Sequence, residues 1–313
     1  MALDPRARRF LDFLAASAQG RPGAVDLTEL RRASEDLAGF AGAPPPVERR
    51  DERLDGCGLG VRIYAPACTS RDALPSLVYF HGGGWISGSL DSHDALCASL
   101  AARGDCRIIA VDYRLAPEHR FPAALDDGFA AVREVLVDPG RFGVDPRRLA
   151  IGGDSAGANL AVVVARALRG EVPPLILQLL LCPVMEPLGR TASRAAFASG
   201  HLIEEATMAF YWERYRIDSL TPDDPRVAPL RAGDFADMAP ALIHTAEFDP
   251  LRDEGELYAQ ALMQAGVAAR ATRHAGMIHH FYGLGGVIPA AQAALARIGD
   301  ELRQAFAAPS GGS

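Results

Sequence analysis

The chain has 313 residues and a mass of 33.2 kDa, enough for one large α/β domain with an appendage. Its hydrophobic content of 49% and charged content of 23% are those of a globular protein. The net charge of −7, without a dense basic cluster, argues against a nucleic-acid-binding surface. All 32 basic residues are arginine. The absence of lysine excludes Schiff-base chemistry, a Walker-type phosphate loop and acylation by a Ser-x-x-Lys pair.

The cysteines and the N-terminus predict a cytoplasmic protein. The first residues contain no apolar run of the kind that follows the basic residues of a signal peptide, and no uncharged apolar stretch is long enough to span a bilayer. The five cysteines are scattered, odd in number and without a Cys-x-x-Cys pair, which favours reduced thiols. They are Cys57, Cys68, Cys97, Cys106 and Cys182.

The N-terminal segment predicts an amphipathic helix followed by a junction and a hairpin. Phe10, Leu11 and Leu14 fall on one helical face. The prolines at 44–46 break the helix. Residues 47–55 and 59–64 then form two strand-like runs around a Gly-Cys-Gly turn.

From residue 77 onward, short apolar runs alternate with helical patterns. This alternation predicts a mainly parallel sheet with both faces covered by helices. We expect strands at 77–80, 107–112, 148–152, 175–181, 241–246 and 268–274, and helices at 91–103, 122–137, 155–169, 253–265 and 288–307.

The segment 185–240 interrupts this alternation and contains an aromatic helix over 203–215. An insertion that follows a strand in such a fold is typical of a cap over the site. The aromatic side chains could instead only pack the insertion onto the sheet; we expect both, with one or two facing the substrate. The expected segments are N-terminal cap helices at 1–45, a core at 46–184, the cap insertion at 185–240, the rest of the core at 241–308 and a flexible tail at 309–313.

Two glycine-rich motifs indicate acyl transfer. Residues 153–157 read Gly-Asp-Ser-Ala-Gly and fit G-x-S-x-G, in which a serine occupies a sharp turn between a strand and a helix. Residues 81–85 read His-Gly-Gly-Gly-Trp and follow an apolar run, so that bare backbone N–H groups could face a developing negative oxygen. We expect His81 to hydrogen-bond within this loop.

Each motif also has a less specific interpretation. The G-x-S-x-G pattern arises by chance in a chain rich in glycine, alanine and serine, but here a buried strand at 148–152 and an apolar helix after 157 provide the context that it requires. The glycine run could belong to a dinucleotide-binding loop, but it does not fit G-x-G-x-x-G and lies well inside the chain.

A serine nucleophile needs a histidine base and an orienting carboxylate, which follow it in the order Ser, Asp or Glu, His. Asp249 closes the strand at 241–246 and is favoured as the acid over Glu247, while Asp253 suits the start of the next helix. His274 lies on the last expected strand and is given a structural role. His279 and His280 lie on the loop that leaves this strand, which suits a base.

Together these motifs resemble the hormone-sensitive-lipase-like esterases. The matching segments are 81–85, 112–118, 153–157 and 249–255. The resemblance implies an α/β-hydrolase fold with a helical cap, and a catalytic triad of Ser155, Asp249 and His279. It also implies oxyanion donors at the backbone N–H groups of Gly83, Gly84 and Ala156. The sequence departs from the family at His280, where glycine is usual.

The function predicted is a cofactor-free serine carboxylesterase for short- to medium-chain esters. An amidase, carbamate hydrolase or deacetylase could use the same triad, and a decayed hydrolase could serve as a receptor. The filled triad argues against the receptor. No metal site is expected, since His279 and His280 lack further ligands at suitable spacing. Substrate contacts are expected from Trp85, Asp154, Tyr211 and His280.

Two further expectations concern the surroundings of the site and the assembly. Arg114 and Glu118 are expected in a buried polar network that supports the site. The family resemblance implies a homodimer formed through the last strand and helix, and an edge strand invites such pairing. No nucleic-acid or membrane partner is expected.

Overall fold

The computed structural model describes residues 2–18, 26–67, 73–170 and 173–308. Within these ranges the strands form one eight-stranded sheet in the order β1-β2-β4-β3-β5-β6-β7-β8. β2 runs antiparallel to both of its neighbours, and the pairs from β4 to β8 are parallel. The strands are β1 (Val47–Arg53), β2 (Gly60–Pro66), β3 (Leu74–Phe80), β4 (Arg107–Val111), β5 (Val144–Asp154), β6 (Leu177–Leu181), β7 (Ala241–Phe248) and β8 (Ala269–Ile278).

The mainly parallel sheet confirms the expected fold class, and β3, β5, β7 and β8 are longer than expected. Every residue of β3 is buried, and β6 is buried throughout. Such continuous apolar strands need helices on both faces. β8 is the edge strand and alternates exposed and half-buried residues before its last three become buried. The expected strand at 268–274 covers this polar part, and the structure extends β8 through Gly276 to Ile278, into the loop that was expected to follow.

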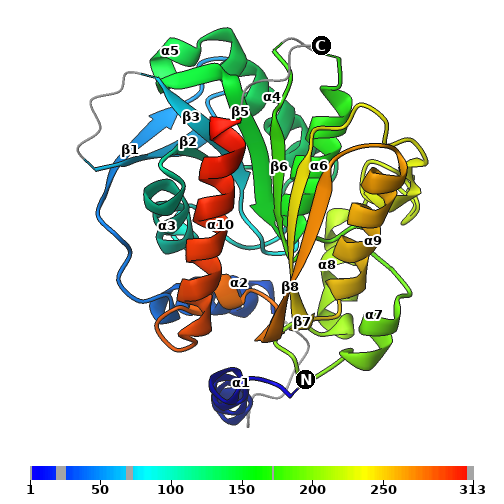
Figure 1. Ribbon diagram of the computed structural model, residues 1–313. Coiled ribbons are helices and arrows are strands. Elements are labelled where there is room, and N and C mark those ends of the chain that lie inside the picture. The colour runs from blue at the N-terminus through cyan, green and yellow to red at the C-terminus, as the bar shows by residue number, and fades with distance from the viewer. Residues whose placement is uncertain (1, 19–25, 68–72, 171–172, 309–313) are drawn as a thin grey trace.

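Helices cover both faces of the sheet (Figure 1). One face carries α3 (Asp94–Gly104) and α10 (Ala290–Ala307), which pack against each other. The other carries α4 (Ala123–Val137), α6 (Ala156–Ala167) and α9 (Arg252–Gln264). Each face encloses its own apolar core. Short helical segments complete the core region: α5 (Pro139–Phe142), η2 (Pro229–Ala232) and η3 (Phe281–Leu284).

Four further helices gather at the end of the sheet where its parallel strands finish (lower part of Figure 1). They are α1 (Pro5–Ala18) and α2 (Leu27–Leu37) from the N-terminal segment, and α7 (Ala192–Ala196) and α8 (Glu205–Tyr215) from the insertion. η1 (Ala38–Phe40) follows α2. We propose that these two groups form the cap over the site. The tail expected at 309–313 lies outside the described residues.

Arg31 fastens α2 to the core. Its guanidinium donates hydrogen bonds to the carbonyl oxygens of Ile86 at 2.8 Å and Ala116 at 3.0 Å, and pairs with Glu118 at 2.7 Å. No side chain of α2 is fully buried, so these bonds give the helix a defined position that apolar burial alone would not supply.

The expected Arg114–Glu118 network is wrong. Arg114 instead makes a two-pronged pair with Asp127 of α4, with a shortest distance of 2.7 Å. The side chains of Arg114 and Glu118 are 46% and 54% exposed. Arg114 and Glu118 are therefore partly in solvent and have separate partners, Asp127 and Arg31. A charge that stays partly in solvent avoids the desolvation cost of a buried network.

Four of the five cysteines lie in the described part of the chain. Cys57 is an exposed free thiol, whereas Cys97, Cys106 and Cys182 are buried free thiols. Cys68 lies outside the described residues. Throughout the described ranges, no helix combines the length and apolar character needed to cross a membrane.

Candidate active site

Ser155 occupies a strained turn between β5 and α6. Its backbone has φ 52° and ψ −118°, a conformation that residues other than glycine rarely adopt. The turn packs directly against the end of β3, and a Cβ on Gly157 would overlap the carbonyl oxygen of Phe80. Glycine at this position therefore permits the close approach that pushes the serine side chain out of the sheet.

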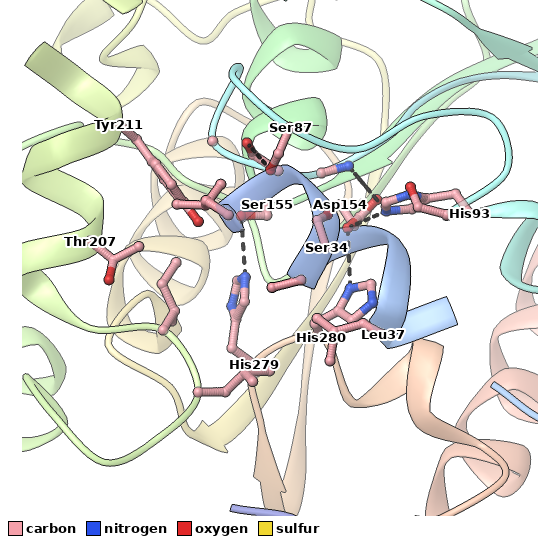
Figure 2. A pocket seen from close by; sticks show the side chains of 18 of the residues that line it. Ser34, Leu37, Ser87, His93, Asp154, Ser155, Thr207, Tyr211, His279 and His280 are labelled. Carbon is pink, nitrogen blue, oxygen red and sulfur yellow. Dashed lines mark hydrogen bonds and ion pairs between the residues drawn. The ribbon is translucent and has the colours of Figure 1, made fainter. Parts of the chain in front are cut away.

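Ser155, His279 and Asp249 form a hydrogen-bonded chain (Figure 2). His279 Nε2 lies 3.2 Å from Ser155 Oγ, and His279 Nδ1 lies 2.8 Å from Asp249 Oδ2. The N–H of Leu251 donates to Asp249 Oδ1 at 2.8 Å and fixes the carboxylate. Burial alone would lower the pKa of His279, but the charge and hydrogen bond of Asp249 outweigh it and raise that pKa. The arrangement can take a proton from the serine hydroxyl and stabilise the resulting imidazolium.

The rival residues from the sequence point elsewhere. Glu247 accepts the backbone N–H of Gly276 at 2.7 Å. Asp253 lies in the first turn of α9 and accepts the N–H of Ser193 at 2.7 Å. His274 Nε2 is 3.1 Å from His244 Nδ1, away from the serine. Of these candidate acids and bases, only Asp249 and His279 belong to the hydrogen-bonded chain that ends at Ser155.

The glycine loop presents its N–H groups on one side. His81 Nδ1 is 2.8 Å from the carbonyl oxygen of Gly82, and Ser87 holds that of Gly83 through its N–H at 3.0 Å and its Oγ at 2.9 Å. In a trans peptide the N–H points opposite to the C=O, so the N–H groups of Gly83 and Gly84 point away from these partners. Both glycines line the cavity beside Ser155, and both have positive φ.

Ala156 supplies the third expected donor position. It is the first residue of α6, where a helix leaves its backbone N–H groups without an intrahelical acceptor. Together with the glycine loop, this geometry suits a developing oxyanion. A Cβ on Gly84 would overlap the ring of Tyr211, so only glycine leaves room for the cap helix at this point.

Asp154 ties the nucleophile turn to the glycine loop. It accepts the N–H of Gly82 at 2.9 Å and the hydroxyl of Tyr79 at 2.8 Å through Oδ1. Its Oδ2 lies 3.2 Å from His93 Nε2 and 3.7 Å from His280 Nδ1. Burial opposes its charge, but these histidines hold the pKa of Asp154 well below its ordinary value. Asp154 is therefore a buried carboxylate with four partners, not a second acid of the triad.

A cavity of about 290 Å³ opens beside Ser155 (Figure 2). Of the expected substrate contacts, Asp154, Tyr211 and His280 line it. Trp85 does not: it is 3% exposed and stacks on Tyr215 with ring centroids 4.6 Å apart. The sequence indicates a large aromatic residue next to the glycine loop, but the positive φ of 63° at Trp85 turns its ring into the core.

Several lining residues come from segments to which sequence reasoning assigned only a general cap role. α2 lines the cavity with Leu30, Ser34 and Leu37, which are half-buried at helical spacing, and with the exposed Ala33; this spacing could have identified the face. His93 precedes α3 and carries no local motif, so only the fold reveals it. The additional lining residues are Leu14, Leu30, Ala33, Ser34, Leu37, Ser87, Ser92, His93, Leu202, Ile203 and Thr207.

The aromatic helix α8 divides its roles as expected. Tyr211 lines the cavity, whereas Trp212 is 2% exposed and packs into the core. Phe210 lies under the guanidinium of Arg214, 3.1 Å from the ring centroid. One ring thus faces the cavity, one packs in the core and one contacts an arginine of the same helix.

The fold and the site identify the class of protein. A family model described as alpha/beta hydrolase fold matches residues 77–283. The chain belongs to this family, and its relatives confirm the resemblance to the hormone-sensitive-lipase-like esterases.

Three relatives cover between 80% and 98% of the chain. An ethyl acetate hydrolase of Pseudomonas putida is 36% identical, covering 97% of this chain and 99% of the relative. The carboxylesterase NlhH of Mycobacterium tuberculosis is 39% identical over 80% of each chain. An ester hydrolase from the metagenome of Lake Arreo, solved with a bipyridine phosphonate derivative, is 37% identical with a TM-score of 0.92. It covers 98% of this chain and 100% of its own.

Proposed function

We propose that this protein is a serine carboxylesterase that hydrolyses short- to medium-chain acyl esters through an acyl-enzyme intermediate. The observation that carries this proposal is the hydrogen-bonded chain Ser155–His279–Asp249, which ends on a cavity beside the glycine loop. Relatives that are named ethyl acetate hydrolase and carboxylesterase support an ester as the substrate.

In the proposed reaction His279 removes the proton of Ser155 as Oγ attacks the ester carbonyl. The backbone N–H groups of Gly83, Gly84 and Ala156 stabilise the tetrahedral oxyanion. His279 then protonates the leaving alcohol, which leaves the acyl group on Ser155. A water molecule, deprotonated by His279, hydrolyses the acyl-enzyme, while Asp249 keeps the imidazole oriented and stabilises its protonated form.

The cavity favours small acyl groups. Its volume of about 290 Å³ lies just below the range for ligand sites, ~300–1,000 Å³. Tyr211 and the α2 side chains Leu30 and Leu37 are part of its wall.

We therefore expect activity on p-nitrophenyl esters to peak between about two and eight acyl carbons, because longer chains exceed this space. kcat/KM measured across a series of acyl lengths tests this, with emulsified triolein as the long-chain comparison. Turnover of triolein comparable to that of the butyrate ester would contradict the proposed substrate class.

The pH dependence follows from His279. The base must be neutral to accept the serine proton, and Asp249 raises the pKa of His279 above its ordinary value of 6.5. Hence kcat/KM is expected to be low in acid, where His279 is protonated, and to rise with pH through an apparent pKa above 6.5. In an Asp249→Asn variant the residual activity should titrate at lower pH. A pH–rate profile of both proteins decides this; an unshifted acidic limb would argue against Asp249 as the partner.

We propose that the chain forms a homodimer through β8 and α10. β8 is the last strand of the sheet, and its outer edge has no strand beside it within the described chain. Light scattering at micromolar concentration should then give twice the chain mass of 33.2 kDa. A single species of the monomer mass would contradict the dimer.

A further inference from the structure

His93, Asp154 and His280 converge on one wall of the cavity. Their ligand atoms lie within 4.8 Å of one another, although the residues are far apart in sequence. Sequence spacing predicts no metal site at His280, but the fold adds His93 from the segment before α3 and Asp154 from the end of β5. Figure 2 shows both imidazole rings directed at the carboxylate from two sides.

We propose that His93 Nε2, Asp154 Oδ2 and His280 Nδ1 form a binding site for a divalent transition-metal ion, preferentially Zn²⁺. The bound ion inhibits the enzyme. Two imidazoles and one carboxylate are a donor set that zinc commonly uses. The site goes beyond the proposed esterase function, because metal binding can be measured without any turnover.

The spacing of the donors suits tetrahedral coordination. Bonds of ~2.0–2.2 Å to zinc place adjacent ligand atoms of a tetrahedron about 3.3–3.6 Å apart. The carboxylate oxygen of Asp154 lies 3.2 Å from His93 Nε2 and 3.7 Å from His280 Nδ1. Only small side-chain shifts are therefore needed to close the triangle around an ion.

The surrounding groups provide the outer support that metal ligands need. Tyr79 and the N–H of Gly82 hold the other oxygen of Asp154 at 2.8 and 2.9 Å. His93 Nδ1 lies 2.9 Å from Ser92 Oγ, so the ring can carry its proton there and offer the Nε2 lone pair to a metal. The ring of His280 can likewise carry its proton on Nε2.

The fourth coordination position faces the cavity. His93, Asp154 and His280 all line the space that also contains Ser155. An ion held by them, with its bound water, would occupy volume that the substrate needs. Inhibition should therefore be competitive, with a raised KM and an unchanged kcat.

A second cluster, Cys182, Asp249 and His279, also has convergent ligand atoms. It is less suited to bind an ion. Burial raises the pKa of the Cys182 thiol well above its ordinary value, and zinc binds the thiolate.

The test is calorimetric titration of the full chain with ZnCl₂ at neutral pH, in a Cys57→Ser background that removes the one thiol exposed within the described residues. We expect one ion per chain. His280→Gly and His93→Gln should each weaken binding by at least ~10-fold, whereas His119→Ala, at an exposed histidine, should not. Co²⁺ should give the visible absorption of a tetrahedral site in the Cys57→Ser protein and lose it in both variants.

Three outcomes overturn the proposal: no binding, unchanged binding in His280→Gly, or binding lost only in Cys182→Ser. Should His93→Gln fail to fold, His280→Gly decides alone, since glycine readily adopts the φ of 57° found there. Binding retained by Ser155→Ala, which leaves the three donors intact, separates this proposal from the esterase function. In kinetics, Zn²⁺ should raise KM and EDTA should reverse it.

Discussion

Ser155→Ala should lower kcat on short-chain esters by at least about 10⁴-fold while the protein stays folded. The substitution removes only the hydroxyl group, whose Oγ accepts the acyl group in the proposed mechanism. Alanine keeps the Cβ that the strained turn already accommodates, so the free energy of unfolding should change little. Kinetics with p-nitrophenyl butyrate and a thermal unfolding curve measure the two quantities.

A matched control uses a second serine of the same cavity. Ser34 lines the cavity from α2, and Ser34→Ala should retain most of the activity. A fluorophosphonate probe should label the parent protein and Ser34→Ala, but not Ser155→Ala. Substantial turnover by Ser155→Ala would reject the acyl-enzyme mechanism on Ser155.

The parts of this site that the sequence predicted are those with local constraints. The turn at Ser155 needs glycine two residues before and after it, and the base and acid follow at strand ends in a fixed order. A single chain therefore shows where Ser155 and Asp249 fall and limits the base to the loop with His279 and His280, while the choice of His279 follows from the family resemblance. The alternation of apolar strands and helices likewise indicates the parallel sheet without any knowledge of contacts.

The parts that were missed depend on tertiary contacts. His93 meets Asp154 only because the loop before α3 folds back over the end of β5. The orientation of Trp85 depends on a positive φ that no motif signals, and its ring packs on Tyr215 from the cap. Ion pairs such as Arg31–Glu118 join segments 87 residues apart, so charge pattern along the chain could not assign them.

The adjacent histidines provide the sharpest test of the triad. His279 Nε2 lies 3.2 Å from Ser155 Oγ, whereas His280 turns its Nδ1 toward Asp154, 3.7 Å away. The backbone explains the divergence: His280 has a left-handed conformation with φ 57°, which directs its side chain away from that of its neighbour. The family usually has glycine here, and glycine adopts this φ without strain.

His279→Ala should therefore lower kcat by about 10³-fold or more, with the residual rate due to the oxyanion donors and substrate binding. His280→Gly should keep most of kcat and change KM or acyl preference. It removes a side chain from the cavity wall and leaves the hydrogen bonds of His279 to Ser155 and Asp249 in place. Steady-state kinetics of both variants on two acyl lengths compare them directly. The reverse pattern, with His280→Gly inactive and His279→Ala active, would move the base to His280. Ser155 and Asp249 would then still need a histidine between them, so the reverse pattern would change the assignment of the base and leave the triad chemistry in place.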